Sequence, residues 1–210
     1  MGKVPAKVET GVRELAKRDP VLRAMYKAHG APDFKRASPG KTHFAELART
    51  ICYQQLAGRA AATIHGRFLA LLDGVPTPES VLALSMEQLR SAGLSGAKAA
   101  SIVDLAEKVD AGLVELEKMN RLPDEVVVRE LVLVRGIGEW TAHMFLMFQL
   151  GRLDVWPIGD YGVRAGFSRM FGFPEMLTPK KLEPEGERFR PYRSIVAWWC
   201  WRATDTVIPD

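Results

Sequence analysis

Residues 133–143 read LVRGIGEWTAH, and residues 157–164, which follow a short apolar segment, read PIGDYGVR. In the first stretch, Gly136 and Gly138 stand between an apolar run and a helix that is expected to begin near Glu139. Glycine lets another backbone approach closely, and the first turn of a helix presents N–H groups that suit a phosphate. The stretch therefore predicts two helices joined by a glycine turn, which is either a phosphate-binding hairpin or an ordinary corner between helices.

Asp160 is the acidic residue of the second stretch, and it lies at the expected start of another helix. Pro157 and Gly159 precede it, and apolar residues follow it at helical spacing. An aspartate at such a place is commonly a helix N-cap. Capping and catalysis are compatible, because one carboxylate can do both.

The composition is that of a globular protein that can bind a polyanion. Of the 210 residues, 47% are hydrophobic and 26% are charged, and the net charge of +4 permits a nucleic-acid partner without requiring one. The first ten residues lack a signal-peptide core and no apolar run reaches membrane-spanning length, so we expect an intracellular protein, cytoplasmic (nucleoid) or nuclear, without a membrane partner. Cys52 and Cys200 are too few for a disulfide framework, a zinc site or an iron–sulfur cluster, so we expect no metal site of this kind.

Nearly every segment has helical periodicity, and strand alternation is absent apart from the β-branched residues 126–128. We therefore predict an all-α fold of about nine to eleven helices. The first helix is expected over residues 12–29, and a second glycine turn, GLSGAK, is expected at residues 93–98. Further helix starts are predicted at Thr42, Thr77, Ser85, Thr178 and Pro191.

Five motifs together resemble one family of DNA repair enzymes. They are GIGEWTA at 136–142, the downstream Asp160, YQQL at 53–56, GLSGAK, and RPYRSIVAWWCW at 190–201. In this order they are similar to the helix-hairpin-helix, Gly/Pro-Asp (HhH-GPD) superfamily of DNA glycosylases, and most similar to its 3-methyladenine DNA glycosylase II branch. The resemblance implies a single glycosylase domain over residues 1–210, built from two helical halves with the active-site cleft between them. A middle barrel at about 42–151 would carry the hairpin 133–143, and residues 1–41 and 152–210 would form the second half.

The resemblance also implies a reaction. Asp160 matches the catalytic aspartate of the family, and a carboxylate near the sugar stabilises the positive charge that develops as an N-glycosidic bond breaks. Trp140 stands where other branches hold a nucleophilic lysine. An indole cannot form an imine, so water is expected to attack and the strand to stay intact. The expected enzyme is a monofunctional glycosylase of alkylated purines.

Three aromatic residues, Trp140, Tyr161 and Trp201, match positions that line the base pocket of the family. A purine alkylated on a ring nitrogen is cationic, and aromatic faces attract such a ring. From local sequence alone, Trp201 and its neighbours Trp198 and Trp199 indicate core packing instead. For Trp198 and Trp199 we keep that interpretation.

The remaining assignments concern the DNA, which is expected to be a duplex containing an alkylated base, bound by a monomer. Gln55 matches the wedge that fills the gap left by a flipped base, although an exposed glutamine at a helix end is the simpler local interpretation. Contacts with the DNA backbone are expected from Gly136, Gly138, Thr141, Arg135 and Lys98. No cofactor is expected beyond a monovalent cation that the family can hold on hairpin carbonyls, here those of Val134 and Ile137.

Two other functions fit the same residues. A non-catalytic helix-hairpin-helix module that recognises damaged DNA would use Asp160 only as a cap. A glycosylase for deaminated bases would share the mechanism, and Gly159, which stands where some relatives carry a second acid, leaves the substrate range open.

Overall fold

The computed structural model describes residues 5–34 and 42–204, and within these ranges the chain is helical with no strand. The chain divides into two compact units. We call Met1–Arg36 with Leu146–Asp210 the terminal unit and Ala37–Phe145 the middle unit. Each boundary lies a few residues before the expected ones at 42 and 151. No helix in the described ranges has both the length and the apolar character that crossing a membrane requires.

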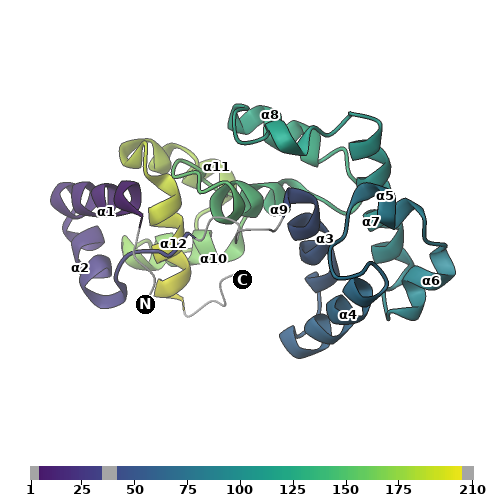
Figure 1. Cartoon of the computed structure of the whole chain (residues 1–210). Helices are drawn as coiled ribbons and strands as arrows, with labels where there is room; N and C mark the ends of the chain where they lie inside the picture. The colour runs from purple at the N-terminus through teal and green to yellow at the C-terminus, as the bar shows by residue number, and fades with distance from the viewer. Residues whose placement is uncertain (1–4, 35–41, 205–210) are drawn as a thin grey trace. The chain divides into compact units, whose positions relative to one another are not determined.

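The terminal unit is built around one buried helix. Its elements are α1 (Ala6–Arg18), α2 (Pro20–His29), α10 (Tyr161–Met170), α11 (Pro179–Leu182), the 3-10 helix η3 (Pro184–Phe189) and α12 (Arg193–Ala203). Every residue of α12 from Ser194 to Trp201 is buried, as expected for a helix that is apolar on all sides. It packs against α10, α2 and α1 (Figure 1). Trp198 and Trp199 are buried, so their prediction as core residues is confirmed.

The predicted first helix over 12–29 is wrong in two respects, because α1 already begins at Ala6 and the chain forms two helices over this range. Asp19 adopts an extended conformation between α1 and α2, and its Oδ1 accepts a hydrogen bond of 2.8 Å from the Val21 N–H. Pro20 disfavours a helical conformation for the residue before it and suits the first position of a helix. The Asp-Pro pair therefore ends one helix and caps the next.

The middle unit holds the two predicted glycine turns. Its elements are α3 (His43–Tyr53), α4 (Gly58–Ala70), α5 (Pro78–Leu82), α6 (Met86–Ser91), α7 (Gly96–Asp110), the 3-10 helix η1 (Leu116–Lys118), α8 (Asp124–Leu131) and α9 (Glu139–Met144). The helix starts predicted at Thr42, Thr77 and Ser85 are confirmed, and each of these side chains accepts a hydrogen bond from the first turn. After α9 the helix continues as a π-helix, η2 (Phe145–Gln149).

Candidate active site

Asp160 is the N-cap of α10, as its sequence context predicts. Its backbone N–H donates to the Pro157 carbonyl at 2.9 Å, which closes a tight turn before the helix. Its Oδ1 then accepts a hydrogen bond of 2.7 Å from the N–H of Val163. The cap fixes where α10 begins and therefore where the carboxylate lies.

A second donor reaches the same carboxylate oxygen from α12. The indole Nε1–H of Trp201 donates to Oδ1 of Asp160 at 2.8 Å. The Trp201 side chain is 1% exposed and stacks on Phe148, with 6.1 Å between ring centroids and 25° between ring planes. Asp160 itself is half-buried. Two N–H donors from different helices thus fix the orientation of one carboxylate beside buried aromatic rings.

The thiol of Cys200 lies close enough to Asp160 to respond to its charge. Burial, and to a smaller extent the negative charge of Asp160, raise the pKa of the Cys200 thiol far above its ordinary value. The second cysteine, Cys52, is also fully buried, and burial raises the pKa of its thiol to about 11. Neither cysteine is therefore a nucleophile at neutral pH.

Gly166 allows α10 and α12 to approach this closely. A Cβ placed on Gly166 would lie 2.0 Å from the carbonyl oxygen of Cys200, which is far too close for a non-bonded carbon and oxygen. The two helices therefore meet backbone to backbone between one and two turns after Asp160. This contact brings the start of α10 within hydrogen-bonding distance of Trp201.

The three aromatic residues predicted for the base pocket have different surroundings. Tyr161, next to Asp160, is 68% exposed, and Trp140, at the start of α9 in the middle unit, is 43% exposed. Trp201 is buried and bonded to Asp160. Tyr161 and Trp140 are thus exposed, whereas the polar edge of Trp201 contacts the carboxylate.

The predicted glycine hairpin joins α8 to α9. Gly136 has a φ of +76°, which favours glycine, and a Cβ there would lie 2.7 Å from Oγ of Ser101 on α7. Gly138 is the N-cap of α9, and nothing lies within 4 Å of the place a Cβ would take. The N–H groups of both glycines have no hydrogen-bond partner among the residues that the structure describes. The hairpin thus presents free donors and open space at one helix N-terminus.

Two side chains that sequence reasoning missed fasten this hairpin to the rest of the middle unit. Oδ2 of Asp104 on α7 accepts a hydrogen bond of 2.7 Å from the Arg135 N–H. Burial opposes ionisation of Asp104, but hydrogen bonds from Lys108 and from the Arg135 backbone prevail and lower its pKa. On the other side, Nε2 of Gln54 donates to the Gly136 carbonyl at 3.0 Å. No local pattern predicts the Asp104 contact, whereas Gln54 lies inside the YQQL motif.

The remaining predicted DNA contacts are all in the middle unit. Arg135 is exposed, Thr141 is buried in the first turn of α9, and Gln55 is exposed directly after α3. Lys98 is half-buried, and its Nζ donates to the Cys52 carbonyl at 2.7 Å. Burial lowers the pKa of Lys98. Through its hydrogen bond to the Cys52 carbonyl, the ammonium group caps the C-terminal end of α3.

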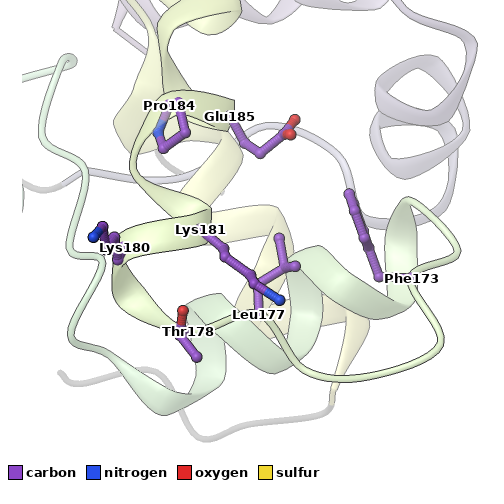
Figure 2. Close-up of a pocket in the computed structure, with 7 residues that line it drawn as sticks. All are labelled: Phe173, Leu177, Thr178, Lys180, Lys181, Pro184 and Glu185. Atoms are coloured by element: carbon purple, nitrogen blue, oxygen red, sulfur yellow. The ribbon is translucent and has the colours of Figure 1, made fainter.

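A shallow pocket of about 590 Å³ lies elsewhere in the terminal unit. Figure 2 shows Leu177 and Lys181 between Phe173 on one side and Lys180 on the other. None of the predicted site residues lines it. In the described ranges, no three side chains of His, Cys, Asp or Glu are grouped as a metal site would require.

Comparison with known proteins gives consistent matches. The sequence model of the HhH-GPD superfamily of base excision DNA repair proteins matches residues 48–191. DNA-3-methyladenine glycosylase 1 of Schizosaccharomyces pombe is 33% identical over 172 residues, which are 80% of this chain and 75% of that protein. The crystal structure of a DNA-3-methyladenine glycosidase from Bacillus halodurans is similar with a TM-score of 0.84 and 32% identity, covering 93% of this chain and 89% of that one. An S. pombe 3-methyladenine DNA glycosylase, solved in complex with abasic DNA, is similar with a TM-score of 0.76 and 29% identity, covering 94% and 98%.

Proposed function

Because this chain belongs to the HhH-GPD superfamily of base excision DNA repair proteins, we propose that it is a DNA glycosylase that hydrolyses the N-glycosidic bond of alkylated purines. The names of its relatives support this substrate class. The observation that carries the proposal is the Asp160 carboxylate, which is half-buried and oriented by the Val163 N–H and the Trp201 indole. We place it in the 3-methyladenine DNA glycosylase II branch.

Asp160 would supply the central electrostatic contribution. As the bond to the base breaks, positive charge builds on the deoxyribose, and a carboxylate stabilises it and orients the attacking water. At about 4 Å and an effective dielectric near 20, the attraction is about 4 kcal/mol. That corresponds to roughly a thousandfold in rate. An alkylated purine is already a good leaving group, because the cationic ring departs as a neutral base, so the site needs no strong general acid.

We propose that the enzyme lacks strand-cleaving lyase activity. Trp140 occupies the second position of α9, where the resemblance places a nucleophilic lysine in other branches. An indole nitrogen carries no lone pair available for attack, so no Schiff base can form there. Water then completes the reaction, and the product is an abasic site in an intact strand.

The exposed rings and the hairpin would bind the flipped nucleotide and its strand. Stacking returns about 1–3 kcal/mol per base, which offsets the few kcal/mol that flipping costs. Tyr161 and Trp140 have the exposed area that stacking needs. The fold itself does not require glycine at position 138, because a Cβ there would meet no other atom within 4 Å. A phosphate that approaches the N–H groups of Gly136 and Gly138 closely would require a glycine at this position. Arg135 and Thr141 would add contacts with the DNA backbone, and Gln55 would be the wedge that fills the gap left by the flipped base.

The hairpin carbonyls of Val134 and Ile137 are oxygen donors of the kind that alkali cations bind. The Val134 carbonyl accepts the Ile137 N–H at 3.1 Å and retains a second lone pair. These two residues would hold a monovalent cation, whose charge would strengthen the attraction of the turn for phosphate.

The test is Asp160→Asn in a base-release assay on methylated duplex DNA. Asparagine is also a good N-cap, so α10 should keep its start. Release should fall by about a thousandfold while binding to the same duplex is retained. Unchanged release would remove Asp160 from the mechanism, and absence of release by the unmodified protein from any methylated duplex would favour a non-catalytic damage-binding module.

A panel of duplexes with single lesions would define the substrate range. Alkylated purines should be released faster than uracil or hypoxanthine, because only the alkylated rings carry a positive charge that attracts aromatic faces. Preference for a deaminated base would contradict the proposed substrate class while leaving the Asp160 mechanism intact.

A further inference from the structure

The exposed turn between α3 and α4 has a strained residue at its tip. Residues 53–56 form a β-turn in which the Leu56 N–H donates to the Tyr53 carbonyl at 3.3 Å. Gln54 has φ −51° and ψ 132°, and Gln55 has a φ of +55°, so the turn is of type II. Glycine or asparagine normally occupies the position that Gln55 takes. A glutamine keeps a left-handed conformation only where neighbouring structure holds it.

Two hydrogen bonds from side chains to backbone carbonyls hold this turn in place. Nε2 of Gln54 donates to the Gly136 carbonyl of the hairpin at 3.0 Å. Nζ of Lys98, from the helix that follows the second glycine turn, donates to the Cys52 carbonyl at 2.7 Å. Gln54 is half-buried, whereas Gln55 is exposed. The turn is therefore fixed on its inner side to both glycine turns, and the side chain of Gln55 remains accessible.

We propose that Gln54 is a positioning residue that presents Gln55 to DNA in a preformed conformation. This inference rests on the proposed function, in which Gln55 enters the base stack. Flipping a base already requires unstacking, and ordering a flexible wedge at the same moment would add to the barrier. A wedge that is hydrogen-bonded to the phosphate-binding hairpin enters the base stack at a fixed distance from the bound phosphates. It therefore avoids this additional loss of entropy.

Gln54 acts through Gln55 in this proposal, which separates it from a residue that only stabilises the fold. Loss of the Gln54 amide should matter only when a base pair must be opened. It should also matter only while residue 55 carries a side chain that can fill the gap. A double-mutant cycle between the two positions measures the second condition directly.

The experiment compares Gln54→Met, Gln55→Ala and the double variant by single-turnover base release, with protein in excess. Each is assayed on a methylated purine paired in duplex DNA and on the same lesion in single-stranded DNA. Methionine keeps the length of the side chain and removes the N–H donor. We expect Gln54→Met to slow release from the duplex about fivefold, as expected for one lost hydrogen bond, and to leave release from the single strand within about twofold. In the Gln55→Ala background it should have no further effect.

Gln88→Met is the matched control, because Gln88 also makes one hydrogen bond through its side chain, accepting from the Ser85 N–H at 2.8 Å. It should leave both rates unchanged. If Gln54→Met does not fold, Gln54→Glu, which has the same length without a donor, takes its place. Equal slowing on the two substrates, or a full fivefold effect in the Gln55→Ala background, would overturn the inference. Absence of release by the unmodified protein would instead count against the proposed function.

Discussion

Trp201→Phe removes the indole donor to Asp160 while keeping an aromatic ring in the core. In the protein, Oδ1 of Asp160 accepts from Trp201 at 2.8 Å and from the Val163 N–H at 2.7 Å. After the substitution, the helix cap from Val163 remains and the bond from α12 is gone. The carboxylate stays at the start of α10, but its orientation is no longer fixed from the second helix.

The size of the effect follows from the kind of bond that is lost. A hydrogen bond to a charged group contributes about 1.5–3 kcal/mol. If that energy holds the carboxylate in its reactive orientation, its loss should slow the chemical step by roughly 10- to 100-fold. The smaller ring also leaves a cavity beside Phe148, so the free energy of unfolding should fall by about 1–3 kcal/mol.

Single-turnover release of a methylated purine, at saturating protein, measures the chemical step separately from binding. Trp199→Phe is the matched control, because Trp199 lies on the same helix, is equally buried, and donates its Nε1–H to the Gly30 carbonyl at 3.0 Å. Both variants should lose similar stability, but only Trp201→Phe should lose rate. A wild-type rate for Trp201→Phe, or equal slowing by both substitutions, would refute a specific role for the bond to Asp160.

Three further outcomes can be checked by denaturant unfolding. Gly166→Ala forces a Cβ against the Cys200 carbonyl and should lower the free energy of unfolding by at least about 2 kcal/mol, whereas Gly159→Ala, with open space around it, should change it little; equal effects would contradict the close helix contact. Gln55→Gly relieves the positive φ and should leave stability unchanged or raise it by up to about 1 kcal/mol, while base release from duplex DNA slows; a clear loss of stability would argue against strain. Burial lowers the pKa of His143 below its ordinary 6.5. The unfolded chain therefore takes up the proton first, and the free energy of unfolding should decrease as the pH falls below about 6.5. His143→Gln should reduce this pH dependence, and an unaltered dependence in that variant would exclude His143 as its source.

The elements that sequence predicted well are those fixed by neighbours in the chain. The capping side chains of Thr42, Thr77 and Ser85, and Asp160 as the cap of α10, are recognisable because cap and helix lie within four residues of each other. The same local reasoning failed at Asp19. The apolar periodicity continues through this residue, although the Asp-Pro pair ends α1 and begins α2 there.

The contacts that orient the candidate site could not be predicted in this way. Trp201 and Asp160 are 41 residues apart, and Gln54 and Gly136 are 82 residues apart. Such pairs depend on how helices pack, and no periodicity within either segment encodes the partner. Family resemblance suggested that Trp201 belongs near the site, but only the packing of α12 against α10 shows that its indole edge donates to Asp160.

The burial of both thiols has a consequence for survival in the chemical setting where alkylated DNA arises. Electrophiles that methylate purines also attack thiolates, and a protein with an accessible thiolate would be inactivated by the agents whose damage it repairs. Cys52 and Cys200 are fully buried and stay protonated at neutral pH. The protein is therefore expected to keep working during exposure to doses of methylating agent that modify enzymes with reactive cysteines.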